Sequence, residues 1–248
     1  MVRLLGAALI WAALTFPATA ACRLALVLAV DVSGSVDAKE YRLQLDGIAA
    51  ALLDPDVSAQ ILATPETPVM LSVFEWSNSL YRRVVVDWVA LDSATRVLDV
   101  AGILRGHSTR PKQGATAIGS AMLFADAMFQ RGPACWQRTI DISGDGTNNF
   151  GPEPERVRQT TAFDRVTING LVIGSDSTRG RDERQMEMME LSAYFRRRVI
   201  HGADAFIEVA QGFDDFERAM TRKLLRETAL PPLGLKQQSK PPRYAVLR

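Results

Sequence analysis

The sequence contains only two histidines and two cysteines in 248 residues. His107 and His201 lie in no catalytic or metal-binding motif, and a zinc hydrolase needs spaced clusters of His or Cys ligands. The sequence also lacks a Gly-x-Ser-x-Gly motif and a phosphate-binding loop of the Walker type. These absences argue against the common hydrolase and nucleotide-binding classes. Both histidines are expected to be surface or loop residues.

The sequence has almost no net charge and only one long hydrophobic run. The formal charge of +1 gives no electrostatic basis for binding nucleic acid or an anionic membrane, and the arginines at 196–198 are expected to be a solvated helix face. The hydrophobic run covers residues 4–16, follows Arg3, and is succeeded by Pro17 and the small residues 18–20.

This layout predicts a secretory signal peptide over residues 1–20. The mature chain is then expected to be secreted or periplasmic, without a membrane span. Retention of the segment as an uncleaved anchor stays open as an alternative. A lipoprotein signal ending at Cys22 is less well supported, because Thr19 stands where such signals usually carry leucine.

Short β-branched runs alternate with helical patterns, which predicts an α/β domain with a mostly parallel sheet. Residues 24–30 are almost wholly apolar, as in a central strand covered on both faces. Residues 69–76 and 80–86 are expected to form an antiparallel hairpin at a sheet edge. Further strands are expected at 137–143, 166–173 and 205–210, and helices at 37–53, 93–104, 117–130, 152–163, 182–198 and 213–226.

We expect one domain over residues 21–228, followed by a flexible tail over residues 229–248. From residue 231 onward, four prolines, one glycine and scattered cations replace the apolar period. No internal repeat is visible in the sequence.

Three segments rich in oxygen-bearing side chains stand where a strand ends or a helix begins. Their sequences are Asp31-Val32-Ser33-Gly34-Ser35, Gly114-Ala115-Thr116-Ala117, and Ser143-Gly144-Asp145-Gly146-Thr147-Asn148. In open α/β sheets, ligands bind beyond the carboxyl ends of the strands, so the three loops can converge there. Hydroxyls and carboxylates suit a small hard cation, Mg²⁺ or Mn²⁺. The sequence therefore predicts that these hydroxyl and carboxylate groups lie within a few ångströms of one point.

Asp31, Ser33, Ser35, Thr116 and Asp145 match the metal-ion-dependent adhesion site of von Willebrand factor A (vWA) domains, written Asp-x-Ser-x-Ser, then Thr, then Asp. The sequence resembles that family over nearly all of the chain after residue 20. It looks most similar to a group of secreted bacterial members of unknown function. The resemblance implies that the two serines and the threonine bind the metal directly and that the two aspartates act through water.

The resemblance also implies a three-layer Rossmann-like vWA sandwich, with five parallel strands, one antiparallel edge strand and helices on both faces. The implied function is non-catalytic protein binding, in which a partner Asp or Glu completes the coordination of the metal. Three alternatives stay open: the site residues only cap helices, the metal only stabilises the fold, or the chain is a Mg²⁺-dependent phosphoryl-transfer hydrolase using Asp31 and Lys112.

In the implied fold Cys22 and Cys135 precede neighbouring parallel strands, so we expect a disulfide between them; two separate buried thiols are the alternative. Asp141 interrupts an apolar strand and is expected to be paired, for example with an arginine, or to support the metal site. Glu75 is expected to be an ordinary charge at the rim of the sheet, or else to border the binding face.

Overall fold

The computed structural model describes residues 22–108, 114–174 and 180–230. The expected signal peptide at residues 1–20 and most of the expected tail lie outside the described residues. No helix within the described ranges is long and apolar enough to cross a membrane.

Six strands form one sheet in the order β3-β2-β1-β4-β5-β6. The strands are β1 (Leu24–Asp31), β2 (Val69–Trp76), β3 (Arg82–Leu91), β4 (Gln137–Gly144), β5 (Thr167–Ile173) and β6 (Ile207–Ala210). All neighbouring pairs are parallel except β2 and β3, which are antiparallel. The expected mostly parallel sheet with one antiparallel edge strand is confirmed.

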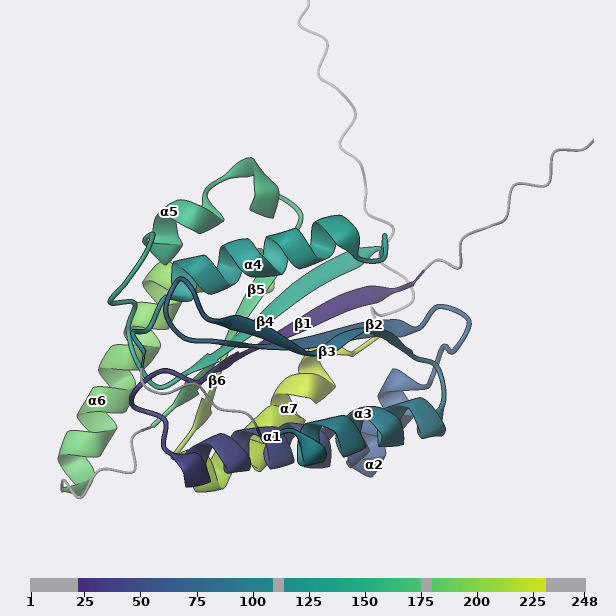
Figure 1. Cartoon of the computed structure of the whole chain (residues 1–248), viewed down its shortest axis with the longest axis horizontal. Coiled ribbons are helices and arrows are strands. Elements are labelled where there is room, and N and C mark those ends of the chain that lie inside the picture. The colour runs from purple at the N-terminus through teal and green to yellow at the C-terminus, as the bar shows by residue number, and fades with distance from the viewer. Residues whose placement is uncertain (1–21, 109–113, 175–179, 231–248) are drawn as a thin grey trace, which may run out of the picture.

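Helices cover both faces of this sheet, which completes the three-layer sandwich (Figure 1). The helices are α1 (Ala38–Leu53), α2 (Pro55–Ile61), α3 (Ala94–Gly106), α4 (Ile118–Arg131), α5 (Pro154–Arg158), α6 (Arg181–Tyr194) and α7 (Phe216–Glu227). One core lies between the sheet and α1, α2, α3 and α7, and a second lies between the sheet and α4 and α5.

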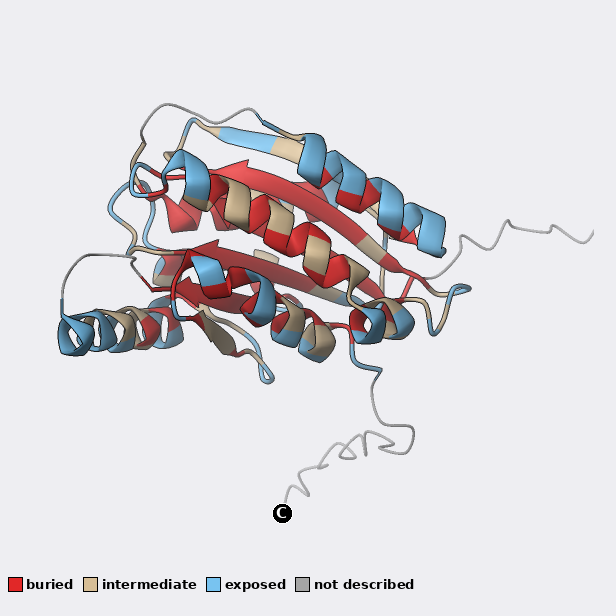
Figure 2. Ribbon diagram, turned by 90° about the horizontal axis from the view of Figure 1, so that it is seen from below, coloured by how far each residue is buried: buried red, intermediate tan, exposed pale blue. Residues whose placement is uncertain are grey.

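The central strand β1 contributes to both cores because its side chains alternate between the two faces. Leu24, Leu26 and Leu28 enter the first core, and Ala25 and Val27 enter the second. Every residue of β1 is buried, and Figure 2 shows the central strands of the sheet as the buried interior of the molecule. This two-sided burial explains why residues 24–30 are almost wholly apolar.

Several elements differ from their expected bounds. Strand β3 extends to Leu91 instead of ending at residue 86. The helix expected at 152–163 stops at Arg158, where the Thr160 hydroxyl donates to the carbonyl of Val157, and a 3₁₀ turn follows at Thr161–Phe163. The helix expected at 182–198 ends as α6 at Tyr194 and continues as a π-helical turn.

Helix α6 projects from the body of the molecule and is mostly exposed (Figure 2). The arginines at 196–198 that follow it are exposed, as expected.

Cys22 and Cys135 form a disulfide with a Cα–Cα distance of 4.6 Å. The two residues lie two positions before the start of β1 and of β4, which are parallel neighbours. The bond therefore lies at the amino-terminal edge of the sheet, and the alternative of two separate thiols is wrong.

Candidate metal centre

The three oxygen-rich loops leave the carboxyl-terminal edge of the sheet. Strand β1 ends at Asp31 and its parallel neighbour β4 ends at Gly144, so the segments 31–35 and 145–148 begin side by side. The segment 114–117 leads into α4, which packs on these two strands.

The first and third loops are joined by direct contacts between predicted site residues. The Ser35 hydroxyl donates to the Asp145 carboxylate at 2.9 Å, and the Ser33 and Ser35 hydroxyl oxygens are 3.3 Å apart. The Asp31 carboxylate accepts a hydrogen bond from the backbone N–H of Ser33 at 2.7 Å. Four of the five predicted residues therefore form one connected cluster, although Ser35 and Asp145 are 110 residues apart in the chain.

Thr116 is brought to the same edge by hydrogen bonds to both other loops. The N–H of Gly34 donates to the carbonyl of Gly114 at 2.8 Å. Asn149 donates to the carbonyl of Thr116 at 2.9 Å, and its side-chain oxygen accepts from the Thr116 N–H at 2.8 Å. A Cβ atom added to Gly146 would lie 3.7 Å from the Thr116 hydroxyl oxygen, which places this hydroxyl beside the Asp145 loop.

The predicted site residues do not act as helix caps. Asp37 is the N-cap of α1 and forms a capping box with Glu40. Ala117 occupies the N-cap position of α4, and no side chain caps that end. The alternative in which Asp31, Ser33, Ser35 and Thr116 only cap helices is therefore wrong.

The Asp31 carboxylate has the character of a group that needs a cation. The side chain is fully buried, and its Oδ2 atom has no hydrogen-bond partner within the described part of the chain. Burial raises the pKa of Asp31 well above its usual value, and the nearby Asp145 carboxylate raises it further. Gly144 leaves the space for this carboxylate, because a Cβ atom there would lie 3.2 Å from Oδ2. A bound cation would relieve both the burial and the repulsion.

The cluster is closed on the sheet side and open on the other. Ser33 and Thr116 are buried, whereas Ser35 is exposed and Asp145 is half-buried. Within the described ranges, no three His, Cys, Asp or Glu side chains group as metal ligands, so any metal here depends on hydroxyl oxygens. A hard cation of the Mg²⁺ or Mn²⁺ type fits this donor set.

Supporting residues that were not predicted hold the loops in place. Ser77 accepts a hydrogen bond from the N–H of Ala117 at 2.9 Å through its carbonyl, and Gln44 donates to the carbonyl of Asp31 at 3.0 Å. The Tyr194 hydroxyl accepts from the N–H of Asn148 at 3.1 Å. Ser77 follows directly after β2, so its place at a strand end was the one available sequence signal.

Glu75 is not a rim charge, and that expectation is wrong. Its side chain is fully buried and accepts hydrogen bonds from the hydroxyls of Tyr41 and Tyr81, at 2.5 and 3.1 Å. His107 Nε2 lies 3.0 Å from the same carboxylate, and the His107 side chain is only 14% exposed. His107 lies in the loop after α3, as one of the two expected settings, but its side chain faces this buried acid and not the solvent. Side chains from three separate segments, Tyr41, Tyr81 and His107, thus contact the buried Glu75 carboxylate.

Asp141 is also buried, and its partner is Lys223 instead of the suggested arginine. The Lys223 ammonium lies 2.9 Å from Asp141 and 2.5 Å from Glu227. Asp141 lies opposite Leu28 of β1, three residues before the end of that strand. The acid is thus paired within the sheet and α7, and the charged groups that act on it are Lys223 and Glu227, not the candidate metal residues.

Solved structures of similar fold belong to vWA-type proteins. Proximal thread matrix protein 1 from the mussel byssus is 16% identical with a TM-score of 0.53, over 84% of this chain and 46% of that protein. The pilus adhesin SpaC from Lactobacillus rhamnosus GG is also 16% identical, with a TM-score of 0.53 over 84% of this chain and 31% of the adhesin. A von Willebrand factor type A protein from Catenulispora acidiphila is 15% identical with a TM-score of 0.52, over 84% of this chain and 42% of that protein.

The chain spans less than half the length of each of these three structures. At such identities the likeness shows the fold, which is that of a vWA domain. The comparison with curated proteins gave no match. One family model, described as "Protein of unknown function (DUF1194)", matches residues 21–232. Because this match covers most of the sequence, the chain belongs to that family.

Proposed function

We propose that the chain is a non-catalytic, adhesion-type domain that binds a protein partner through a divalent cation, Mg²⁺ or Mn²⁺. The observation that carries this proposal is the meeting of three loops at the sheet edge where the buried Asp31 carboxylate lies, whose Oδ2 atom has no hydrogen-bond partner among the described residues. The proposed ligands are Asp31, Ser33, Ser35, Thr116 and Asp145.

In this proposal the hydroxyls of Ser33, Ser35 and Thr116 hold the cation directly, and Asp31 and Asp145 hold it through water. Hydroxyl ligands carry no charge, so the cation stays electrophilic and favours a carboxylate from outside. An Asp or Glu of the partner completes the coordination. One form of the mussel byssus protein was solved with a zinc-occupied MIDAS motif, which supports a divalent cation in a domain of this fold.

The surroundings of the site support a protein partner. Leu80 follows β2 and is 90% exposed, and Phe150 follows β4 and is 51% exposed. Both lie in loops that also carry supporting residues of the site, Ser77 and Asn149. These two exposed apolar side chains are available for contact with a partner bound at the site.

We also propose that the chain acts in the cell envelope or outside the cell. The Cys22–Cys135 bond supports this location, because disulfides persist mainly in oxidising compartments. Cell fractionation with sequencing of the mature amino terminus tests it. A mature chain that begins at Ala21 is expected, and a chain retained in the membrane with its first residues intact would contradict cleavage.

The metal site is tested by titrating the purified protein with Mg²⁺, Mn²⁺ and Ca²⁺ in a calorimeter. The double variant Ser33→Ala/Ser35→Ala should lose Mg²⁺ and Mn²⁺ binding. Ser58→Ala, on α2 and away from the site, is the matched control and should bind as the wild type does. Absence of Mg²⁺ and Mn²⁺ binding by the folded wild-type protein would remove the basis of the proposal.

The binding function is tested by pull-down from periplasmic extract with Mg²⁺ and with chelator. Capture that needs both the cation and Ser33 and Ser35 supports the adhesion-type role. A cation that raises the melting temperature without promoting capture would favour a purely structural metal. Turnover of a generic phosphate ester that is abolished by Asp31→Asn would favour the phosphoryl-transfer alternative. Lys112, which that alternative also needs, lies outside the described residues.

A further inference from the structure

One face of α6 lines two adjoining pockets at the same edge of the sheet as the candidate metal centre. Arg181, Arg184, Met188 and Leu191 follow one another at the spacing of a single helix face. The first pocket, of about 280 Å³, is bordered by Asp145 and Gly146 of the candidate site and by Met188 and Leu191. The second, of about 400 Å³, shares Gly174 and Met188 with the first. Together they form a continuous groove that begins at Asp145.

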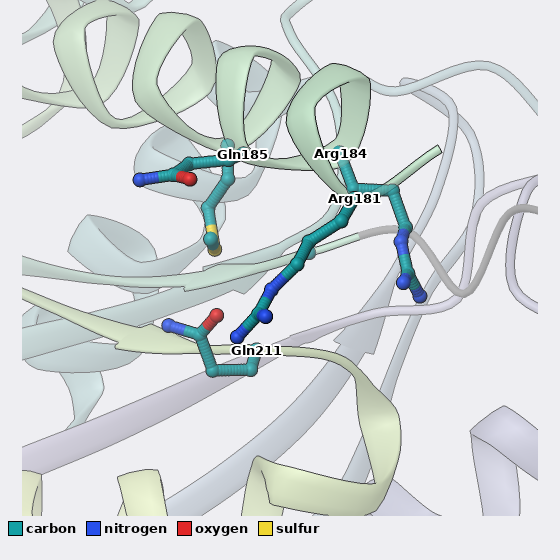
Figure 3. A pocket seen from close by; sticks show the side chains of 6 residues that line it. Arg181, Arg184, Gln185 and Gln211 are labelled. Atoms are coloured by element: carbon teal, nitrogen blue, oxygen red, sulfur yellow. The ribbon is translucent and has the colours of Figure 1, made fainter. Parts of the chain in front are cut away.

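The far end of this groove is positively charged. Arg181, Arg184 and Gln185 of α6 line the second pocket together with Gln211, which follows β6. Figure 3 shows the Arg181 side chain extending from α6 toward Gln211 across the pocket. Neither guanidinium group has an ion pair or a hydrogen bond to another described residue, whereas Arg198, just beyond α6, pairs with Glu155. We name the pocket lined by Arg181, Arg184, Gln185 and Gln211 the arginine pocket.

The Arg181 guanidinium group and the neighbouring Gln211 side-chain amide make a site for a carboxylate, and Arg184 adds positive charge to the same pocket. A guanidinium group binds a carboxylate through two parallel N–H donors, and amide groups can donate further hydrogen bonds. The arginine pocket and the candidate metal centre therefore favour the same chemical group at the two ends of one groove.

We propose that the arginine pocket binds a second acidic side chain of the protein partner, in the same segment whose first acidic side chain completes the cation. This inference rests on the proposed function for the first acid only. The partner segment is then an extended stretch with two separated acids, and the arginine pocket sets its direction along α6.

The middle of the groove favours an apolar residue between the two acids. Ile173, Met188 and Leu191 line this part, together with Glu187 and Glu190. Glu190 would repel a third acid placed between the ends. A partner with a continuous acidic run is therefore disfavoured relative to one with two separated acids.

The length of α6 sets the separation of the two acids. Leu191 and Arg184 are seven residues apart, which corresponds to about 10 Å along a helix that rises about 1.5 Å per residue. An extended peptide advances about 3.3 Å per residue, so it covers this length in about three residues. The step from Leu191 to the cation adds about one further residue, so we expect the two acids of the partner segment to be about four positions apart.

Three fluorescein-labelled peptides test the inference by fluorescence anisotropy with the full chain in Mg²⁺. All three are amidated at the carboxyl terminus, so that only side chains supply carboxylates: Asp-Ser-Leu-Ser-Asp carries two separated acids, Asp-Ser-Leu-Ser-Asn carries one, and Asp-Asp-Ser-Leu-Ser has the same composition as the first with adjacent acids. The first should bind about fivefold or more tightly than the other two, as expected for one added charge-assisted contact.

Two double variants separate the arginine pocket from general charge effects. Arg181→Gln/Arg184→Gln should lower the affinity for Asp-Ser-Leu-Ser-Asp to that for Asp-Ser-Leu-Ser-Asn and leave the latter unchanged. Arg196→Gln/Arg197→Gln removes the same charge from the exposed residues beyond α6 and should change neither affinity. Unchanged melting temperatures of both variants should show that the effect is local.

The inference is overturned if the adjacent-acid peptide binds as tightly as the separated one, if both double variants weaken binding equally, or if no peptide is distinguished from another. Chelator distinguishes this failure from failure of the proposed function. If Asp-Ser-Leu-Ser-Asn binds equally with and without Mg²⁺, the cation role is wrong. A loss on Arg181→Gln/Arg184→Gln that persists for Asp-Ser-Leu-Ser-Asp in chelator would still support the arginine pocket.

Discussion

The Lys223 ammonium lies 2.9 Å from the Asp141 carboxylate, and both side chains are buried between the sheet and α7. Glu227 approaches the same ammonium at 2.5 Å and accepts a hydrogen bond from Asn169 at 2.8 Å. One cation thus faces two buried acids. Burial raises the pKa of Asp141 to about 7, with a further rise from Glu227 and an opposing decrease from Lys223.

The raised pKa of Asp141 predicts that this residue makes the protein less stable as the pH increases from about 4 to about 7. In that interval the folded chain keeps the proton on Asp141, whereas the unfolded chain has released it, since an ordinary Asp has a pKa of about 3.9. The folded state binds more protons, so the free energy of unfolding falls with increasing pH. Asp141→Asn should remove this component of the pH dependence.

Urea denaturation of the wild type and of Asp141→Asn at several pH values between 4 and 8 measures the effect. Asp87→Asn, at an exposed residue of β3, is the control and should leave the pH dependence unchanged. A constant difference in unfolding free energy between wild type and Asp141→Asn at all pH values would contradict the prediction.

Replacement of Lys223 should be strongly destabilising. Lys223→Met keeps the apolar part of the side chain but leaves Asp141 and Glu227 without their cation, which we expect to cost about 3 kcal/mol or more. The loss should be larger at pH 8 than at pH 5, because a protonated Asp141 needs no counter-charge. Lys39→Met, at a 74% exposed lysine paired with Asp214, should cost less than about 1 kcal/mol.

Removal of the disulfide should destabilise the chain without displacing the metal loops. Cys22 and Cys135 enclose a long segment, with a sequence separation of 113, and loss of such a bond typically costs about 2–5 kcal/mol. Cys22→Ser/Cys135→Ser should therefore lower the urea midpoint, yet bind Mg²⁺ with the affinity of the wild type under conditions where it is folded. A large loss of Mg²⁺ affinity in the folded variant would show that the two edges are coupled.

Two glycines should respond to alanine in opposite directions. A Cβ atom at Gly114 would lie 2.0 Å from the Ser77 hydroxyl oxygen, so either the Ser77 side chain must give up its hydrogen bond to the carbonyl of Ala115 or the loop that carries Thr116 must move, and Gly114→Ala should lower both stability and Mg²⁺ affinity. Gly102 lies within α3 with nothing within 4 Å of an added Cβ atom. Gly102→Ala should stabilise the chain by about 0.5–1 kcal/mol through helix propensity. Thermal unfolding with and without Mg²⁺ measures both effects.

The sheet was predictable because its strands are short apolar runs separated by polar turns. A central strand such as β1 must be apolar on both faces, and this pattern is visible in the sequence without further information. Helix α2, with seven residues from Pro55 to Ile61, was missed because such a short segment shows less than two turns of apolar period. Its start was marked locally, however, by Asp54 as N-cap and Pro55 in the first turn.

The convergence of the metal loops was also predictable, because strand ends in a parallel sheet meet at one edge. The surroundings of Glu75 could not be predicted from the sequence. Its partners Tyr41, Tyr81 and His107 come from α1, from the turn before β3 and from the end of α3, and no spacing in the sequence relates them. The partner of Asp141 was not predictable either, because Lys223 comes from α7, the last helix in the sequence order of the described chain.

The disulfide has a consequence for the order in which the sheet can open. Strands β1 and β4 are tied covalently at one end and by the Ser35–Asp145 contact at the other, so neither end of this pair can fray freely. Separation must begin at the flanks, where the four-residue β6 has a partner on one side only. We therefore expect the backbone amide hydrogens of β1 and β4 to exchange with solvent last, after those of β6 have exchanged.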